Sequence, residues 1–327
     1  MLKEHRVNTL KHGDVFRDWL INLLEERIRN KNCHVAVYKI APASHTVCRY
    51  EFEDENYSVI AKFYAEPTGW KKNYNPVKSM KREFKNLQVV DKIIDVPKPL
   101  AAKKEFNCVL VTEYIHARPL YMYMKNEIGL YDRLTAVARL LRKLHDSTQS
   151  HYHKEGDFYK FHQTLDQLHL NKELRETFNQ LLGDWWHSSL LDRSTGCMIH
   201  HDANPVNYVF KGEKVYGLDF ESARLYANPV HDLGVMAAEL KHYFALHKKD
   251  GNRAEPYIGH FLWQYSRDLS EFKRIIRTLP FFMSLGLLRM DRLKRISKNQ
   301  LIEIVIYYYN YDGCYEDSHR LFYSTGI

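Results

Sequence analysis

The spacing of hydrophobic and polar positions changes several times along the chain of 327 residues. Over 14–30, apolar residues recur at intervals of three and four, which is typical of an amphipathic helix. The period then becomes two, and β-branched and aromatic residues become frequent, which favours strands. A second helix is predicted over 77–90. Five strands are predicted, over 34–40, 46–52, 57–64, 100–103 and 108–114.

Beyond residue 119 nearly every segment has helical spacing, and the one exception is a short hairpin predicted at 208–219. Strands followed by helices are typical of an α+β protein whose parts have separate cores. We therefore predict a bilobal chain with a small antiparallel-sheet lobe and a larger, mainly helical lobe. The predicted divisions are an N-terminal helical extension over 1–33, the sheet lobe over 34–116 and the helical lobe over 117–327.

The composition is that of an ordinary globular protein, with 45% hydrophobic and 27% charged residues. No apolar run approaches the roughly 20 residues that a membrane-spanning helix needs, so no membrane span is predicted. The first residues have no pattern typical of a signal peptide. The five cysteines are odd in number and far apart, which argues against a disulfide scaffold and a zinc finger. A cytoplasmic protein is expected.

The net charge is +8, and part of it is concentrated in a basic cluster at 71–85. This cluster contains six basic residues and one acidic residue, Glu83. It either attracts an anionic partner, such as a nucleotide, a nucleic acid or an acidic lipid, or forms a solvated helix face. Aromatic residues do not alternate with the basic ones, which argues against a nucleic-acid partner. The sequence does not indicate an oligomeric state.

The region of the predicted hairpin carries the clearest chemistry. Asp202 and Asn207 occupy one irregular loop before the hairpin, and Asp219 follows its second strand. Because a short turn brings the start of the first strand beside the end of the second, Asn207 and Asp219 are predicted to meet. Two oxygen ligands suit Mg²⁺, which completes its coordination with phosphate oxygens and water.

This H-x-D-x-x-x-x-N loop with its hairpin and later aspartate resembles the catalytic core of the protein-kinase-like superfamily, most closely the aminoglycoside phosphotransferase and choline kinase branch. The resemblance implies a protein-kinase-like fold in which Asp202 orients the acceptor hydroxyl and takes its proton. It implies that Asn207 and Asp219 hold magnesium on the phosphates of ATP. His200 is then a packing and hydrogen-bonding residue that fixes the loop. Asp232 is expected to be the N-cap of the next helix and to tie back to this loop.

The predicted sheet lobe resembles the nucleotide-binding lobe of the same superfamily. Lys62, at the end of the third predicted strand, resembles the lysine that contacts the α- and β-phosphates of ATP. Glu83, in the following helix, is the expected ion-pair partner of Lys62. The segment 109–115 resembles the linker that binds adenine through backbone groups, which implies such a role for Glu113 and Ile115.

The turn between the first two predicted strands departs from the protein-kinase pattern. Protein kinases have a glycine-rich loop there, because glycine lets backbone amides approach the phosphates closely. The turn at 41–48 contains no glycine. The hydroxyl groups of Ser44 and Thr46 are the expected substitutes as phosphate donors.

The acceptor class follows from the spacing after Asp219. Twelve residues separate Asp219 from Asp232, too few for the activation segment on which protein kinases dock a peptide. His201 stands before Asp202 where protein kinases have arginine. We therefore expect an ATP- and magnesium-dependent phosphotransferase that moves the γ-phosphate to a hydroxyl of a small molecule, such as a sugar, an amino alcohol or a related metabolite.

Two alternatives stay open from the sequence. One is a compact atypical Ser/Thr protein kinase, and the other is a catalytically inactive kinase fold that acts as a scaffold. The presence of all three polar residues of the motif, Asp202, Asn207 and Asp219, argues against the scaffold. The sequence does not identify the acceptor, the preference between ATP and GTP, or the role of the helices after residue 250.

Overall fold

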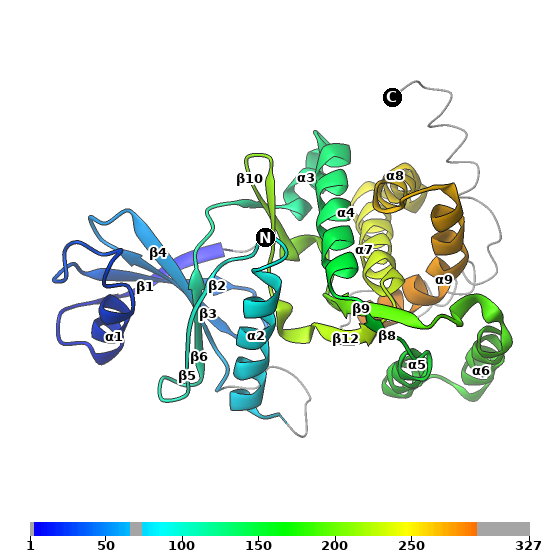
Figure 1. Ribbon diagram of the computed structural model, residues 1–327, viewed down its shortest axis with the longest axis horizontal. Coiled ribbons are helices and arrows are strands. Elements are labelled where there is room, and N and C mark those ends of the chain that lie inside the picture. Colours follow the sequence, from blue (N-terminus) through cyan, green and yellow to red (C-terminus); the bar gives the residue numbers. More distant parts are fainter. Residues whose placement is uncertain (1–2, 66–73, 293–327) are drawn as a thin grey trace. The chain divides into compact units, whose positions relative to one another are not determined.

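The computed structural model describes residues 3–65 and 74–292, which form two compact units (Figure 1). The first unit runs to Ala117 and also includes Tyr216–Glu221. The second comprises Arg118–Val215 and the chain from Ser222 onward. The sequence predicts that Ala117 and 216–221 belong to the helical lobe, whereas the contacts of the chain group them with the first unit.

The first unit is built on a six-stranded antiparallel sheet with the order β1-β2-β3-β4-β6-β5. Two helices accompany it, α1 (Val15–Leu23) and α2 (Pro76–Val90). The strands are β1 (Lys3–Leu10), β2 (Val35–Ala41), β3 (Thr46–Phe52), β4 (Tyr57–Phe63), β5 (Pro99–Lys103) and β6 (Val109–Glu113). The five strands expected from the period of two are therefore present.

The predicted helical extension over 1–33 is wrong for its first part. Residues 3–10 form β1, which pairs with β2 from Lys3 opposite Ala41 to Leu10 opposite Val35. The side chains of residues 4–8 are exposed. No face of this strand is therefore buried over these residues, and the sequence lacks the hydrophobic alternation that would predict a strand. Strand β1 is held by backbone pairing with the edge of β2 and by the ion pairs of Arg6 with Glu53 and of Glu4 with Arg49, and neither requires a hydrophobic pattern.

Helix α1 covers one face of the sheet. Asp14 caps the helix, since its carboxylate accepts the backbone N–H groups of Phe16 and Arg17 at 3.0 and 2.9 Å. Leu20 and Leu24 pack in one core cluster with alternating residues of the strands, among them Ala61 of β4. Because neighbouring residues of a strand point to opposite faces, Lys62 faces away from this core. The alternation in β4 thus decides which face of the sheet carries the lysine.

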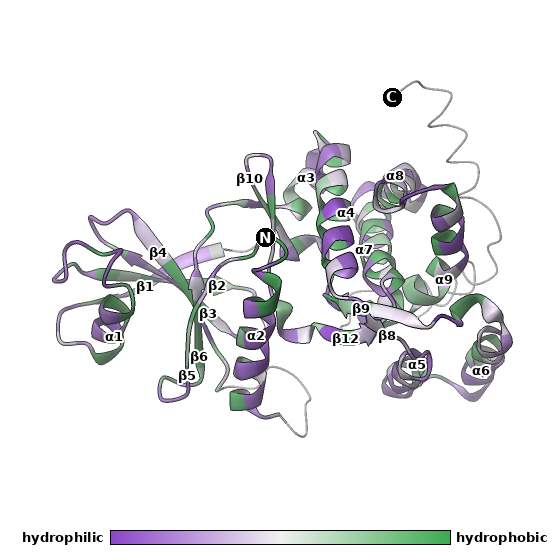
Figure 2. Cartoon of the chain, viewed as in Figure 1, coloured by the Kyte–Doolittle hydropathy of each residue, from purple (hydrophilic) through white to green (hydrophobic). Residues whose placement is uncertain are grey.

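Helix α2 carries the basic cluster. Asn75 caps it through the backbone N–H of Lys78, and α2 contains both hydrophobic and hydrophilic residues along its length (Figure 2). Its basic residues Lys78, Lys81, Arg82 and Lys85 are exposed, whereas Glu83 is buried. Lys71 and Lys72 lie outside the described residues. Exposed basic side chains are compatible with a solvated face and with an anionic partner, so both alternatives stay open.

The second unit is mainly helical. Its helices are α3 (Leu120–Asn126), α4 (Leu130–Ser147), α5 (Glu155–Gln167), α6 (Lys172–His187), α7 (Val230–Lys248), α8 (Glu255–Tyr265) and α9 (Leu269–Arg292). Within the described residues, none of the chain's helices is both long and apolar enough to cross a membrane. The predicted order of an antiparallel-sheet part followed by a mainly helical part is confirmed.

Two small sheets accompany these helices. The hairpin of β10 (Tyr208–Lys211) and β11 (Lys214–Gly217) is extended by β7 (Arg118–Pro119). A second sheet has the order β12-β9-β8, with β8 (Ser150–His151), β9 (Thr195–Ile199) and β12 (Arg224–Ala227). The sequence predicted the hairpin alone. Strands of two to five residues are too short to show a period, and their partners are distant in sequence, so this second sheet was missed.

Helices α7 and α9 approach each other closely at two glycines. A Cβ atom on Gly234 of α7 would lie 2.7 Å from the backbone carbon of Phe282 in α9, and one on Gly286 would lie 3.1 Å from Cβ of Ala238. Phe281 and Phe282 are fully buried in the core of this unit. Because glycine has no side chain, these two positions allow α9 to pack directly on the backbone of α7.

We expect Gly234→Ala to destabilise the protein by roughly 1–3 kcal/mol, because the new methyl group overpacks a contact that is made by backbone atoms. Urea unfolding measures the change. Gly183→Ala in α6 is the matched control, since no atom lies within 4 Å of its added Cβ. That control should stabilise by about 0.5–1 kcal/mol, through helix propensity alone. Equal effects at the two positions would contradict the close packing of α7 and α9.

Candidate active site

The loop 200–207, between β9 and β10, is held by a buried carboxylate of α7. Asp232 Oδ2 accepts the backbone N–H of His200 at 2.7 Å, and Oδ1 accepts that of His201 at 2.8 Å. His145 Nε2 lies 3.2 Å from Asp232 Oδ2. The expected tie between Asp232 and the loop is therefore present. The expected N-cap is wrong, because Pro229 occupies the cap position and Asp232 lies within the first turn of α7.

The electrostatics of Asp232 follow from these contacts. Its side chain is fully buried, and burial by itself raises the pKa of a carboxyl group. Hydrogen bonds from His145 and His231 and the charges of neighbouring histidines outweigh burial, so the pKa of Asp232 lies well below its usual range. Asp232 is thus charged, and both of its oxygen atoms accept N–H groups of the loop rather than those of its own helix.

We expect Asp232→Ala to destabilise the protein by roughly 2–5 kcal/mol, because it leaves the buried N–H group of His200 and the partly buried N–H group of His201 without their acceptor. Thermal and urea unfolding measure the loss. Asp132→Ala is the control, since Asp132 also lies in the first turn of a helix, α4, but is exposed. It should cost about 1 kcal/mol or less. Similar losses in both variants would show that the carboxylate does not hold the loop.

The side chain of His200 is buried and packs inside the loop that it begins. Its Nδ1 atom accepts the backbone N–H of Asp202 at 3.3 Å, and its ring centroid lies 5.8 Å from that of Tyr208. The next residue, His201, has a φ of 67°, and its ring stacks on His231 with centroids 4.8 Å apart. A left-handed φ is strained for histidine and persists only when surrounding contacts maintain it. The ring contact with His231 therefore supports the backbone conformation of the loop at His201.

The two oxygen atoms of Asp202 have different surroundings. Oδ1 accepts hydrogen bonds from Asn204 Nδ2 at 3.1 Å and from Arg289 Nη2 at 2.5 Å. Oδ2 lies 3.3 Å from Nδ2 of Asn207, which also donates to the backbone oxygen of Asp202 at 2.9 Å. Burial raises the pKa of Asp202, but the charges of Arg289 and His200 and the hydrogen bonds outweigh it, so the pKa lies below its usual range.

Arg289 is a residue that the sequence analysis missed. It lies on α9, in the part of the chain whose role the sequence left open, and Nη1 of its side chain also donates to the backbone oxygen of His201 at 3.0 Å. No sequence motif marks it among the basic residues of the C-terminal third. Only the packing of α9 brings it to the loop.

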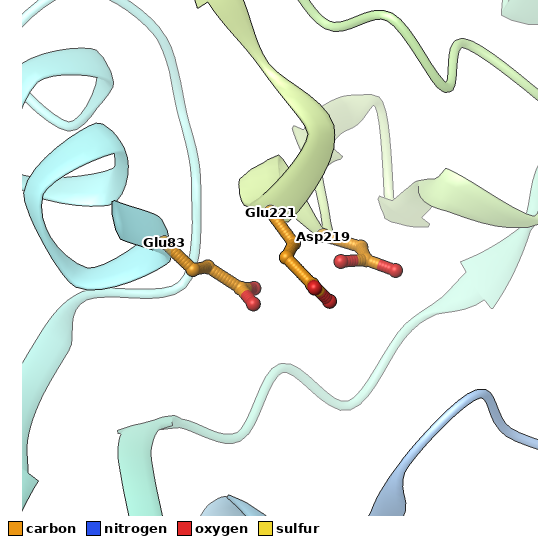
Figure 3. A group of neighbouring side chains, drawn as sticks. All are labelled: Glu83, Asp219 and Glu221. Carbon is orange, nitrogen blue, oxygen red and sulfur yellow. The ribbon is translucent and has the colours of Figure 1, made fainter. Parts of the chain in front are cut away.

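In the first unit, three carboxylates surround one ammonium group. Lys62 Nζ lies 2.8 Å from Glu83 Oε2, 2.9 Å from Asp219 Oδ1 and 3.3 Å from Glu221 Oε2. Figure 3 shows the three acidic side chains next to one another, with Glu221 between Glu83 and Asp219. The contact between Lys62 and Glu83 is the one expected from the sequence. Glu221 was missed as a site residue, although it stands two positions after Asp219, where protein kinases have the glycine of their D-F-G motif.

Three further side chains contact the acidic residues of this Lys62 cluster, and one of them is Arg82, whose Nη2 lies 3.8 Å from Glu221 Oε1. The hydroxyl group of Tyr64 donates to Glu83, and His45 Nε2 lies 2.9 Å from Glu221 Oε2. His45 lies between Ser44 and Thr46 in the turn before β3. It is buried, and it was not predicted as a site residue, whereas its two neighbours were. The left-handed φ of 59° at Asp219 adds a strained backbone position beside the cluster.

The charges in the Lys62 cluster shift one another. Burial lowers the pKa of Lys62, but the charges of Glu83 and Asp219 outweigh it, so this pKa lies well above its usual value. Burial raises the pKa of Glu221, but the hydrogen bond with His45 and the charge of Lys62 lower it to about 2. Burial dominates at Glu83 and raises its pKa. Lys62 and Glu221 are therefore charged over the physiological range.

The cluster has the donor atoms of a divalent-cation site. One carboxylate oxygen from each of Glu83, Asp219 and Glu221 lies within 4.8 Å of the others. Carboxylate oxygens are the ligands that Mg²⁺ prefers. These residues fit a magnesium ion. Asn207 belongs to the second unit and Asp219 to the first, and their expected meeting stays a prediction.

The remaining predicted site residues lie at the margins of the sheet. Ser44 is exposed, and Thr46 begins β3 opposite Phe63 of β4. Glu113 ends β6, where its backbone N–H donates to the oxygen of Lys98 at 3.0 Å, and Ile115 follows directly. Their expected contacts with a nucleotide stay predictions.

Comparisons with known proteins identify the family of the chain. Residues 40–266 match the phosphotransferase enzyme family, APH. The chain belongs to this family. The resemblance identified from the motifs is therefore confirmed, and the protein is a phosphotransferase. A search of curated proteins found no match.

Solved structures of kinases share the fold of this phosphotransferase. An ethanolamine kinase of Plasmodium vivax has a TM-score of 0.61 at 12% identity, covering 90% of this chain and 86% of its own. A putative aminoglycoside phosphotransferase of Ralstonia eutropha has a TM-score of 0.60 at 11% identity, covering 92% and 98%. Choline kinase of Cryptosporidium parvum has a TM-score of 0.57 at 14% identity, covering 94% and 97%. These similarities show the kinase-like fold.

Proposed function

We propose that this phosphotransferase uses ATP and magnesium and transfers the γ-phosphate to a hydroxyl group of a small molecule. The observation that carries the proposal is the Lys62 cluster, in which a buried lysine contacts three carboxylates at 2.8 to 3.3 Å. A nucleotide-binding site requires a cation for the phosphates and acidic oxygens for the metal ion, and this cluster supplies both. Nucleotide binding is assigned to the first unit, and acceptor binding to the second.

On the nucleotide side, Lys62 contacts the α- and β-phosphates, and Glu83 holds the lysine in place. The hydroxyl groups of Ser44 and Thr46 donate to the phosphates, and backbone groups of Glu113 and Ile115 bind the adenine. Asn207 and Asp219 hold the magnesium ion in this proposal, and the contact of Glu221 with the same cluster adds it to the ligand set. When bound, magnesium would supply neutralisation of the phosphate charge.

On the acceptor side, Asp202 orients the hydroxyl group, while His200 and Asp232 hold the loop. The acceptor oxygen forms a bond to the γ-phosphorus as the bond from that phosphorus to the bridging oxygen breaks. The bond's electron pair leaves with ADP, and the hydroxyl proton passes to Asp202 and then to water. Because such transfers have a loose transition state, positioning supplies most of the acceleration, and the low pKa of Asp202 suits an orienting role.

A small molecule is favoured over a protein as the acceptor. The residues between Asp219 and Asp232 are occupied by a 3-10 turn, Phe220–Ser222, and by β12, which belongs to a sheet. Protein kinases use this part of the chain as an activation segment that docks an extended peptide. The regular structure found here supports an acceptor that does not need such a segment, such as a sugar or an amino alcohol.

ADP release measured with MgATP and a panel of sugars, amino alcohols and nucleosides tests the proposal. A general protein substrate such as casein serves as the comparison. We expect ADP release with at least one small hydroxyl compound and none above background with the protein. A thermal shift with MgATP, compared with ATP and EDTA and with MgGTP, tests nucleotide and metal dependence separately. Protein phosphorylation alone would favour an atypical protein kinase, and no thermal shift with any nucleotide would favour an inactive scaffold.

A further inference from the structure

The 200–207 loop receives two contacts from α9. Arg289 Nη2 donates to Oδ1 of Asp202 at 2.5 Å, and Nη1 donates to the backbone oxygen of His201 at 3.0 Å. The two donors belong to one planar guanidinium group, so the directions of the two hydrogen bonds are fixed relative to each other. Arg289 therefore connects the carboxylate of Asp202 to the backbone that precedes it.

The position of Arg289 depends on the packing of α9 against α7. Gly286 lies three residues before Arg289 on the same face of α9 and packs against Ala238 of α7. Helix α7 also carries Asp232, which accepts the N–H groups of His200 and His201. Two helices therefore hold the loop. Asp232 of α7 accepts two of its backbone N–H groups, and Arg289 of α9 donates to one of its backbone oxygens and to the Asp202 carboxylate.

These contacts make the two oxygen atoms of Asp202 unequal. Oδ1 accepts from both Arg289 and Asn204, whereas the contact of Oδ2 among the described residues is with Asn207 at 3.3 Å. The torsion that rotates a carboxylate is soft and broad, so without these donors the oxygen atoms would exchange places readily. A charge-assisted hydrogen bond of 2.5 Å opposes that rotation strongly.

We propose that Arg289 is a positioning residue for the transfer reaction, which fixes the Asp202 carboxylate so that Oδ2 receives the acceptor hydroxyl. The inference rests on the proposed function and goes beyond it, since it assigns a reaction role to the C-terminal helix. Arg289 does not touch the nucleotide or the reacting atoms in this account. Its loss should therefore lower kcat and leave nucleotide binding unchanged.

Arg289→Met and Arg289→Lys test the proposal in the full chain, using MgATP and the most active acceptor of the hydroxyl panel. For Arg289→Met we expect kcat to fall roughly 10²-fold, the typical effect of a small misplacement of a reacting group, while KM for ATP changes less than about twofold. Arg289→Lys should also lose activity, because one ammonium group does not reproduce the planar pair of donors. Arg277→Met is the matched control, since Arg277 is exposed on the same helix, and it should keep the wild-type kcat.

Chemical rescue separates positioning from a purely structural role. Methylguanidinium added at millimolar concentration to Arg289→Ala should restore part of kcat and should not raise the activity of Arg277→Met. Circular dichroism and the thermal shift with MgATP establish that each variant is folded and binds nucleotide. If Arg289→Met does not fold, Arg289→Lys, which keeps the charge and the length of the side chain, decides the result.

The possible outcomes are distinguishable. A wild-type kcat in folded Arg289→Met or Arg289→Lys overturns the inference and leaves the proposed function intact. A fall in kcat matched by an equal loss of ATP affinity, with no rescue, also overturns it, because the residue would then act on the fold as a whole. A wild-type protein that releases no ADP with any acceptor overturns the proposed function and this inference with it.

Discussion

Replacement of Asp219 by alanine is expected to abolish the magnesium dependence of ATP binding and to lower kcat by roughly 10³-fold or more. Metal ions contribute several kcal/mol to the stabilisation of a phosphoryl-transfer transition state, and each 1.4 kcal/mol is a factor of about ten in rate. Asp219 is also a partner of Lys62, but Glu83 and Glu221 continue to contact the lysine. The variant should therefore stay folded and retain weak binding of ATP.

Isothermal titration with ATP, in magnesium and in EDTA, measures this effect directly. The wild type should bind ATP more tightly in magnesium, and Asp219→Ala should bind it equally in both conditions. Glu105→Ala is the control, since Glu105 is an exposed carboxylate of the same unit. Unchanged magnesium-dependent binding in Asp219→Ala would show that the metal assignment is wrong.

Replacement of Asp202 by alanine is expected to remove turnover while ATP binding persists. The loss in kcat should be at least about 10²–10⁴-fold, the range typical of a general base, because both orientation and proton transfer are lost. The change leaves the Arg289 guanidinium without its carboxylate partner, and this side chain is only partly buried, so the cost in stability is small. Binding of ATP should persist because Asp202 has no assigned contact with the nucleotide.

Steady-state kinetics and a thermal shift with MgATP provide the two measurements for Asp202→Ala. Asp202→Asn is the second variant, because the amide keeps the shape of the side chain and lacks its charge. Asp184→Ala, at an exposed position of α6, is the control and should behave as the wild type. Full activity in Asp202→Asn would contradict the role of a charged carboxylate. Loss of MgATP binding in both variants would place Asp202 on the nucleotide side of the reaction.

The contact between Lys62 and Glu83 was predictable because the resemblance to the nucleotide-binding lobe implies it and because both residues occupy the expected elements. Lys62 ends an alternating strand, and Glu83 is the one acidic residue in a basic helix that follows it. The family was recognised from a local pattern as well, since Asp202, Asn207 and Asp219 are spaced within one loop and its hairpin.

The sequence did not show which side chains far apart in the chain contact Glu221. Glu221 stands where a protein kinase has glycine, and the structure shows that its carboxylate contacts both Lys62 and His45. These contacts join segments that are 159 and 176 residues apart in the chain. Neither a period nor a motif records which distant side chains become neighbours, so the other members of the Lys62 cluster became apparent only in the folded unit.

The sequence by itself determined the order of the elements, the family and the residues of the local motif, because periodicity and spacing depend on neighbours along the chain. Tertiary structure decided the rest. Strand β1 exists through backbone pairing with β2, Asp232 faces a loop rather than its own helix end, and Arg289 reaches Asp202 through the glycine contacts of α7 and α9. Each of these depends on atoms brought together from distant parts of the chain, and packing decides which atoms those are.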